Sequence, residues 1–563
     1  QYYRSARSNL FRQRNQLMHR VASMYYPVEP KSFAVHFVPL RTLAVFQVNR
    51  HTGDGDSRGV YHFFSMRSIF KSIKKSLLQT FALSALLVPI IAATTVRDGA
   101  WAVTDSDFAR IFRPEESWSV VIADAQNGRV VYRQNPQTPR MPASNLKVYV
   151  TAAAFDLLGS HYRYRTPFLV RGKLSPQGVL VGDLLVRGSG DPTFSGRFEE
   201  DSKDVTARFS RWADRMKELH IRTVKGNLYG DDSIFDKNYW GREWPEDEYC
   251  NWYTAPSGGL ILNDSCLDIG VFPGTAVGSP PRIETIPDTK YLRIENNART
   301  IARGQKNGVS FRRPFDSNDL AMYGKVAADS RGTQHVVALA DPTGYFVNVL
   351  KETLEKEGIE ILGEAKDARE EPDLPRHGWK VLTIENSPPL KELAKVINTR
   401  SQNLFADSLL KTLGAKKAGM GNWAGGSMAV REWVREQGLP VEHLHLEDGS
   451  GLSRLNRVTA ETTCDLLHHI QKKPWFPLWK ETLAVSGEYP GSLRNRLKTS
   501  TLKGKVRAKT GYIDDVYCLS GYVEAKSGKE YVFSMLFNGK SHAGKHPHHR
   551  MEEALTLVAR EEP

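Results

Sequence analysis

The chain has 563 residues, of which 40% are hydrophobic and 25% are charged. This composition is typical of globular proteins, and the length suits about two to four domains, so wholesale disorder is excluded. Most of the formal net charge of +14 lies before residue 103, and no basic stripe interleaved with aromatic residues follows it. We therefore expect no nucleic-acid partner, whereas an acidic substrate is compatible with the charge.

The stretch 66–102 has the three-part pattern of a secretory signal peptide. An apolar run at 81–93 and then small residues follow its basic start, and cleavage after Ala93 or after Ala102 would fit. The basic residues are Arg67, Lys71, Lys74 and Lys75. The short run favours cleavage, although an uncleaved anchor and peripheral membrane association stay open. We expect an exported protein of the periplasm or cell envelope, and residues 1–65 to be a non-functional upstream extension.

The predicted elements begin with a hairpin at 118–133, where two apolar runs flank an Asn-Gly turn. A helix follows over 144–158, with apolar residues at helical spacing. The stretch 166–385 is rich in short strand patterns and turns, which indicates β-rich inserted material with one amphipathic helix near 346–354.

After residue 385 the pattern changes to helices, at 390–397 and 404–413, each with one apolar face. The end of the chain predicts three strands and a last helix, at 506–509, 519–524, 531–537 and 551–559. This order predicts an α/β (α+β) domain whose antiparallel sheet is flanked by helices.

The four cysteines are too few to staple a chain of this length. Cys250 and Cys266 bracket a loop and could pair in an oxidising compartment or stay free. Cys464 lies in a helical pattern and Cys518 in a strand pattern, so we expect both to be buried thiols.

Three short motifs stand far apart in the chain: Ser-x-x-Lys at 144–147, Ser-x-Asn at 401–403 and Lys-Thr-Gly at 509–511. Each is weak alone, because a helix cap or a turn explains it and Ser-x-x-Lys also begins at Ser68, Ser72 and Ser500. Only Ser144 begins a strongly patterned helix, whose first unpaired N–H groups can help to form an oxyanion hole. The three motifs in this order, after an export signal, favour a catalytic serine site.

The spacing places Lys147 one helical turn from Ser144, so its amine can take the hydroxyl proton. Burial and a second cation would lower the pKa of this amine, and Lys509 is the candidate for that cation. Ser401 is expected to relay the proton to the leaving amine, and Asn403 to bind the substrate amide.

The substrate-binding stretch is expected to be Thr510, Gly511 and Tyr512. Thr510 with Lys509 would hold a terminal carboxylate. The backbone near Tyr512 would stabilise the oxyanion together with the N–H of Ser144.

With these motifs the chain resembles, from about 103 to 560, the class C low-molecular-mass penicillin-binding proteins, the D-alanyl-D-alanine carboxypeptidase/endopeptidase family. The likeness includes further short stretches, at 190–193 (Gly-Asp-Pro-Thr), 226–227 with 231–232, 255–256 (Ala-Pro), 448–454 (Asp-Gly-Ser-Gly-Leu-Ser-Arg) and 520–522 (Ser-Gly-Tyr). The long gap between Ser144 and Ser401 is also similar to that of the family.

The resemblance implies a β-lactamase/penicillin-binding-protein-like domain interrupted by two β-rich inserted domains. The acylating domain would comprise 103–165 and 385–563. Inserted domain II would comprise 166–245 and 346–384, and inserted domain III would comprise 246–345.

The resemblance also implies that peptidoglycan stem peptides and cross-links acylate Ser144, that water hydrolyses the acyl-enzyme, and that β-lactams act as inhibitors by acylating it. Family members place an acidic side chain before the Ala-Pro element, near the diamino residue of the substrate, which would be Asp247 or Glu248 here. A β-lactamase or transpeptidase of the same fold, and a silent wall-binding protein, are the alternatives.

We expect neither a cofactor nor a metal site. Four histidines near the end of the chain are expected to form a solvated surface: His542, His546, His548 and His549. Two departures from the family stand out, since Tyr512 replaces a small hydroxyl residue and Gln402 replaces the more frequent Asp. The first is expected to alter carboxylate recognition, whereas the second lies between the contacting residues and is expected to be tolerated.

Overall fold

The computed structural model describes residues 104–114, 116–540 and 546–562, together with two strands nearer the start of the chain. The chain forms two compact units, Gln1–Ala100 and Trp101–Pro563. In the first unit, β1 (Leu43–Val48) pairs antiparallel with β2 (Val60–Ser65). The predicted signal peptide at 66–102 lies outside the described residues, as does most of the predicted extension at 1–65. Within the described ranges, no helix combines the length and apolarity that crossing a membrane requires.

The second unit contains a six-stranded antiparallel sheet in the order β18-β19-β20-β21-β3-β4. Its strands are β3 (Trp118–Asp124), β4 (Val130–Gln134), β18 (Ala484–Val485), β19 (Val506–Ile513), β20 (Val516–Glu524) and β21 (Glu530–Asn538). The predicted hairpin therefore joins strands from the other end of the chain, through β3 and β21.

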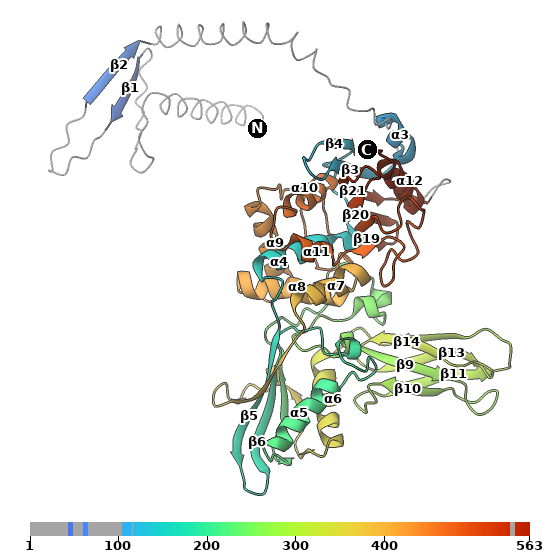
Figure 1. Ribbon diagram of the computed structural model, residues 1–563. Helices are drawn as coiled ribbons and strands as arrows, with labels where there is room; N and C mark the ends of the chain where they lie inside the picture. Colours follow the sequence, from blue (N-terminus) through green and yellow to red (C-terminus); the bar gives the residue numbers. More distant parts are fainter. Residues whose placement is uncertain (1–42, 49–59, 66–103, 115, 541–545, 563) are drawn as a thin grey trace, which may run out of the picture. The chain divides into compact units, whose positions relative to one another are not determined.

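Both faces of this sheet are covered by helices (Figure 1). Along β3, Val120 and Ile122 enter one core with α3 and α12, while Val121 and Ala123 enter a second core with the other helices. This alternation follows from the two-residue period of a strand. The helices are α3 (Asp105–Phe112), α4 (Lys147–Leu157), α7 (Leu390–Arg400), α8 (Asn403–Leu413), α9 (Trp423–Glu436), α10 (Ala460–Ile470), α11 (Phe476–Lys480) and α12 (Pro547–Ala559), with a π-turn η7 (Gly414–Ala418) after α8.

The central helix α4 is buried from Lys147 to Phe155. A helix that is apolar all round can be stable only inside a core, and here the neighbours of α4 include α7, α8 and α9. The helix begins later than predicted, because Ser144 lies in a preceding 3₁₀ turn, η1 (Ala143–Leu146). This placement puts a lysine at the buried start of α4.

The inserted material contains three further sheets. The first comprises β5 (Arg165–Leu174), β6 (Val179–Arg187), β7 (Thr223–Val224), β8 (Leu228–Asp231), β15 (Glu360–Ile361), β16 (Ala365–Asp367) and β17 (Lys380–Asn386), with α5 (Ala207–Glu218) and α6 (Pro342–Lys356). The two smaller sheets comprise β9 (Cys266–Phe272), β10 (Arg282–Ile286) and β14 (Thr333–Ala338), and β11 (Ile294–Ile301), β12 (Gly308–Arg312) and β13 (Leu320–Ala327). The short turns are η2 (Gly196–Phe198), η3 (Glu246–Glu248), η4 (Trp252–Thr254), η5 (Asn263–Ser265) and η6 (Ala368–Glu370). The predicted domain boundaries stay a prediction, and α6 and β17 each run across one of them.

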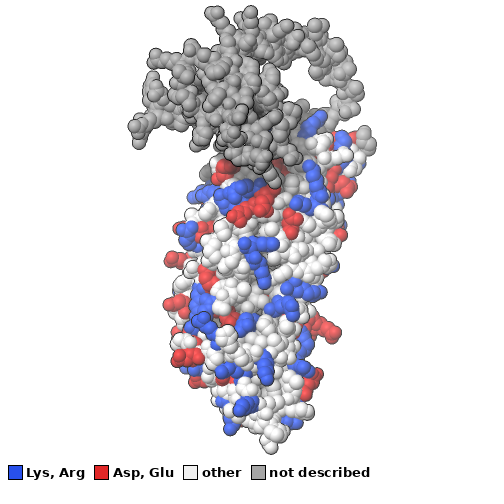
Figure 2. Space-filling view, turned by 90° about the vertical axis from the view of Figure 1, so that its left-hand side faces the viewer, with Lys and Arg blue, Asp and Glu red and all other residues white. Residues whose placement is uncertain are grey.

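The structure confirms the predicted fold class, a mixed α/β architecture with an antiparallel sheet flanked by helices. All four cysteines are free thiols, so the disulfide between Cys250 and Cys266 that the sequence left open is not formed. Cys464 on α10 and Cys518 on β20 are buried, as expected. Lys, Arg, Asp and Glu side chains are scattered along the described part of the face in Figure 2.

Candidate active site

Ser144 and Lys147 meet where η1 turns into α4. The Nζ of Lys147 lies 2.8 Å from the Oγ of Ser144, and the Lys147 side chain is fully buried. Between them, Asn145 donates a hydrogen bond to Ser520 on β20, which holds the turn against the sheet. The predicted spacing of three residues therefore brings the amine to the hydroxyl.

Two further acceptors surround the amine of Lys147. These are the Oδ1 of Asn403, at 2.8 Å, and the backbone carbonyl of Ser450. Burial lowers the pKa of Lys147 to about 8, while the nearby carboxyl groups of Asp407 and Asp448 act in the opposite direction. At neutral pH about a tenth of the molecules therefore carry a neutral amine that can accept a proton.

A second lysine and serine form the opposite side of the site. Lys509, on β19, donates to the Oγ of Ser401 at 2.8 Å and to the carbonyl of Thr510 at 2.7 Å. Ser401 ends α7 in the left-handed conformation, with φ of 63°. Burial lowers the pKa of Lys509 well below its usual range, and the charge of Lys147 lowers it further. Burial, one of the two expected causes, is the main cause of the lowered pKa of Lys147, and the repulsion between the two lysines lowers the pKa of Lys509.

The strand β19 packs its backbone directly against the serine turn. A methyl group on Gly511 would lie 2.6 Å from the carbonyl oxygen of Pro142. The hydroxyl of the preceding Thr510 donates to Ser492, and Tyr512 lies at the rim with 58% of its side chain exposed. The absence of a side chain on Gly511 allows β19 to lie close to the serine turn, while Thr510 and Tyr512 lie nearer the surface.

The side chain of Asn403 connects Lys147 to η4 in the inserted material. Its Oδ1 accepts from Lys147, and its Nδ2 donates to the carbonyl of Tyr253 in η4 at 2.9 Å. The expected contact of Asn403 with the substrate amide stays a prediction, and in this structure both polar atoms of its side chain are bonded to the protein.

The two acidic candidates before the Ala-Pro element differ in their surroundings. Glu248 is half-buried beside the ring of Tyr253, and burial together with Glu248 raises the pKa of Tyr253 to about 12. Asp247 is exposed and makes no hydrogen bond or ion pair with any described residue. Of the two, Glu248 is therefore the one connected, through Tyr253, to Asn403.

The loop 448–454 packs against the serine turn and bonds to Lys147. This stretch is part of the family resemblance, but sequence reasoning assigned it no place in the site. Asp448 accepts the N–H of Gly451 at 2.7 Å and that of Ser453 at 2.6 Å. Gly451 has a φ of +83°, and a Cβ there would lie 1.9 Å from the carbonyl oxygen of Ala143, so only glycine fits. The Asp and Gly residues of the stretch were a turn signal, but its contact with the serine turn is tertiary.

The side chain of Gln402 bonds to the inserted material and not to Lys147 or Lys509. Its Nε2 lies 2.5 Å from the Oδ2 of Asp264, which also pairs with Arg197. Asn263, Asp264 and Ser265 all have positive φ, so η5 presents this carboxylate in an unusual backbone conformation. Gln402 thus links the Ser-x-Asn motif to the inserted material through Asp264.

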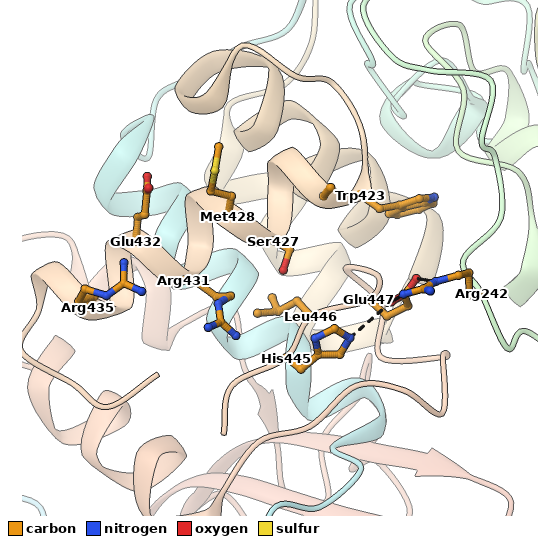
Figure 3. A pocket seen from close by; sticks show the side chains of 11 residues that line it. Arg242, Trp423, Ser427, Met428, Arg431, Glu432, Arg435, His445, Leu446 and Glu447 are labelled. Atoms are coloured by element: carbon orange, nitrogen blue, oxygen red, sulfur yellow. Dashed lines mark hydrogen bonds and ion pairs between the residues drawn. The ribbon is translucent and has the colours of Figure 1, made fainter. Parts of the chain in front are cut away.

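A separate cavity of about 610 Å³ lies beside α9 (Figure 3). Trp423, Met428, Arg431 and His445 line it, and Arg242 pairs there with Glu447 at 2.6 Å. None of the predicted catalytic residues lines it.

The histidines near the end of the chain do not form a fully solvated surface. His546 and His548 are half-buried, with ring centroids 4.8 Å and 5.2 Å from that of Tyr517, so the expectation is wrong for these two. His549 is exposed, and His542 lies outside the described residues. The described part of the chain holds no group of three His, Cys, Asp or Glu side chains placed to bind a metal.

Comparisons with known proteins agree over most of the chain. The model of the D-Ala-D-Ala carboxypeptidase 3 (S13) family matches residues 109–561. The chain is 32% identical over 440 residues to a D-alanyl-D-alanine carboxypeptidase of Actinomadura sp., covering 76% of this chain and 78% of the relative. It is 26% identical over 433 residues to D-alanyl-D-alanine carboxypeptidase DacB of Haemophilus influenzae, covering 75% and 85%.

A solved structure confirms the fold. The crystal structure of penicillin binding protein 4 (dacB) from Haemophilus influenzae aligns with a TM-score of 0.69 at 23% identity, covering 81% of this chain and 98% of that one. The same protein has also been solved in complex with a β-lactam. From the family match and the Actinomadura relative, the chain belongs to the D-Ala-D-Ala carboxypeptidase 3 (S13) family, a family of class C low-molecular-mass penicillin-binding proteins.

Proposed function

We propose that in this serine-type D-alanyl-D-alanine carboxypeptidase Ser144 is the nucleophile and Lys147 the general base. The enzyme class follows from the family and from the relatives that cover most of the chain. The assignment of the two residues is carried by the buried Nζ of Lys147, 2.8 Å from the Oγ of Ser144. A lysine whose pKa burial lowers to about 8 is close to the value at which a base works best at neutral pH.

In acylation, Lys147 takes the proton of Ser144 while Oγ bonds to the carbonyl carbon of the substrate. The N–H of Ser144 and the backbone near Tyr512 stabilise the oxyanion. Ser401 gives its proton to the amine of the leaving D-alanine as the C–N bond breaks, and Lys509, which donates to Ser401, replaces that proton.

The charge of Lys147 affects the pKa of Lys509 in the direction that these proton transfers require. The charge that Lys147 gains lowers the pKa of Lys509, so protonation of the first favours deprotonation of the second. In hydrolysis the attacking water passes its proton through Ser401 to Lys509. Lys147 returns its proton to the Oγ of Ser144 as the ester C–O bond breaks.

The substrate carboxylate is proposed to bind beside Lys509 and Thr510. An anion entering next to a buried lysine raises the pKa of that lysine, so the carboxylate of a terminal D-alanine would charge Lys509 when it is needed as a donor. Glu248, beside Tyr253, is proposed to face the diamino residue. Tyr512 at the rim is proposed to contact the carboxylate-binding end of the cleft.

Peptidoglycan stem peptides and cross-links are the proposed substrates, and β-lactams the proposed acylating inhibitors. Support comes from the names of the relatives and from the β-lactam complex of the Haemophilus influenzae protein. The sequence pattern at 66–102 supports export to the periplasm or cell envelope, with peripheral membrane association as a further proposal.

Labelling with a fluorescent penicillin tests these roles. The full chain should form a stable covalent adduct, and Ser144→Ala should lose it. Ser500→Ala is a matched control, because Ser500 begins another Ser-x-x-Lys but is exposed on a turn, and it should label normally. Labelling of Ser144→Ala at the normal rate would overturn the assignment of the nucleophile.

Product analysis tests the substrate. Release of free D-alanine from a stem pentapeptide is expected, and it should disappear in Ser144→Ala. Splitting of cross-linked dimers without D-alanine release would make the protein an endopeptidase alone, and rapid turnover of penicillin would make it a β-lactamase.

A further inference from the structure

A buried carboxyl group lies directly behind the proposed base. Asp407 is on α8, one turn after Asn403, so both side chains leave the same face of the helix. Asp407 is fully buried, and its Oδ1 accepts the N–H groups of Gly449 and Ser450, each at 2.8 Å. The Asp407 side chain therefore fixes the N–H side of Ser450, the residue whose carbonyl accepts from Lys147, while Asp448 accepts the N–H of the peptide group that carries this carbonyl.

The loop 448–454 packs tightly against α8 at Gly449. A Cβ on Gly449 would lie 2.3 Å from the carbonyl oxygen of Ala406 and 2.9 Å from the Cβ of Leu410. The loop backbone is thus packed onto the helical turn that carries Asp407. Its position relative to Lys147 is set by α8, which also supplies Asn403.

The two carboxyl groups near Lys147 are bonded differently. Asp448 uses both oxygens, accepting from Gly451 and Ser453 and from the side chains of Trp244 and Asn456. Asp407 uses Oδ1 alone, and its buried Oδ2 has no hydrogen-bond partner among the described residues. Leaving a buried acceptor unpaired is costly, so such an atom calls for an explanation.

We propose that Asp407 is a positioning residue, which holds the carbonyl of Ser450 so that Lys147 presents its lone pair to Ser144. A neutral amine has two N–H bonds and one lone pair. If the N–H bonds point to the Oδ1 of Asn403 and to the carbonyl of Ser450, the lone pair is left for the hydroxyl of Ser144. After the proton transfer, the three N–H bonds of the ammonium point to the same three oxygens.

The charge of Asp407 has a second effect on the base. The titratable groups around Lys147 are Asp407 from α8, Asp448 from the loop and Lys509 from β19. The two carboxyl groups raise the pKa of Lys147, and the charge of Lys147 lowers the pKa of Lys509. The carboxyl group of Asp407 raises the pKa of Lys147, and this opposes the effect of burial. Burial raises the pKa of Asp407 itself well above its usual value, while the charge of Lys147 lowers it, so Asp407 acts on Lys147 as a charge at pH values above its own raised pKa. Replacing Asp407 by a neutral residue should therefore shift the acid limb of the acylation profile to lower pH.

Two variants separate geometry from charge, and the inference rests on the proposed role of Lys147. Asp407→Asn keeps an oxygen that can accept the two N–H groups but loses the charge. It should acylate within about tenfold of the native rate, with the acid limb moved to lower pH. Asp407→Ala also loses the anchor and should acylate about 100-fold more slowly, since a displacement of about 1 Å can cost that much.

The measurement is the rate of acylation of the full chain by a fluorescent penicillin across a pH series, with KM and kcat for D-alanine release. KM should change little, because Asp407 is buried behind the lysine. Asp191→Asn is the control, since Asp191 is also a buried carboxylate, bonded to the N–H and hydroxyl of Thr193 and paired with Arg208, but lies in the inserted material. It should leave the rate and the pH profile unchanged even if thermal stability falls.

The outcomes decide between positioning and a structural role. Equal acylation rates in Asp407→Asn and Asp407→Ala, or an unmoved acid limb in Asp407→Asn, would overturn the proposal. Should Asp407→Ala fail to fold, Asp407→Asn still tests it through the limb. Failure of the proposed base itself would appear separately, as normal acylation in Lys147→Met.

Discussion

Gly511→Ala tests whether β19 and the serine turn are held together by backbone contact. The φ of Gly511 is outside the left-handed region, so alanine introduces no backbone strain and the effect is steric alone. The new methyl would lie 2.6 Å from the carbonyl oxygen of Pro142, 3.2 Å from the N of Asn145 and 3.0 Å from the Cβ of Cys518. These atoms belong to the residue before η1, to η1 itself and to the paired strand β20, so the methyl meets both the serine turn and the sheet.

The magnitude follows from the overlap. Carbon and oxygen normally approach to about 3.3 Å, so the contact with Pro142 is too close by about 0.7 Å. Overpacking of this kind costs about 1–3 kcal/mol of folding free energy. If half of the overlap is relieved by moving β19 away from η1, Lys509 and Ser144 separate by a few tenths of an ångström, and acylation should slow by about tenfold.

The assay is acylation by fluorescent penicillin together with urea unfolding. Gly308→Ala is the matched control, because Gly308 also lies in a strand without positive φ, and no atom lies within 4 Å of a Cβ built there. The control should keep both the native rate and the native stability. If Gly511→Ala acylated at the native rate with native stability, the close approach of β19 to the serine turn would be wrong.

Three further results are expected. Acylation should rise with pH through about 8, because burial lowers the pKa of Lys147 to that value and the protonated amine below it cannot take a proton; a rate that does not depend on pH between about 6 and 9 would contradict this. Gln402→Glu, measured by urea unfolding, should destabilise the protein by about 3 kcal/mol, because it places a second carboxylate, at a buried position, against half-buried Asp264; unchanged stability would show that the contact is absent. Mass spectrometry of the non-reduced protein should find Cys250 and Cys266 unlinked, and a mass two hydrogens lower would refute the free thiols.

The elements that local patterns encode were predictable. The two apolar runs around the Asn-Gly turn predicted the hairpin of β3 and β4, and the helical spacing after Ser144 predicted α4. The distance between Ser144 and Lys147 is likewise local, because three residues separate them on one turn. Sequence reasoning therefore gave the fold class and the first pair of the site.

The rest of the site depends on contacts that no local pattern contains. The acceptors of Lys147 come from Asn403 and Ser450, and the identity of a residue does not state which distant amine it will face. Burial, the main cause of the lowered pKa of Lys147, is set by the packing of α4 among other helices, so the sequence could name burial as a cause but not its extent. Asp407 sits in a helical pattern with nothing to distinguish it from a surface residue.

The helix α8 explains why the acylating machinery and the inserted material form one compact unit. Beyond Asn403 and Asp407, the same face continues to Lys411, which is fully buried and bonds to Asp236 at 3.0 Å and to the carbonyl of Ser257 at 3.1 Å. A buried ammonium needs such partners, since it is costly without them. One helix face thus anchors the inserted segment through Lys411 and, through Asn403, both η4 and the proposed base. The surroundings of Lys147 therefore depend on the contacts between α8 and the inserted segment as well as on the helices packed around α4.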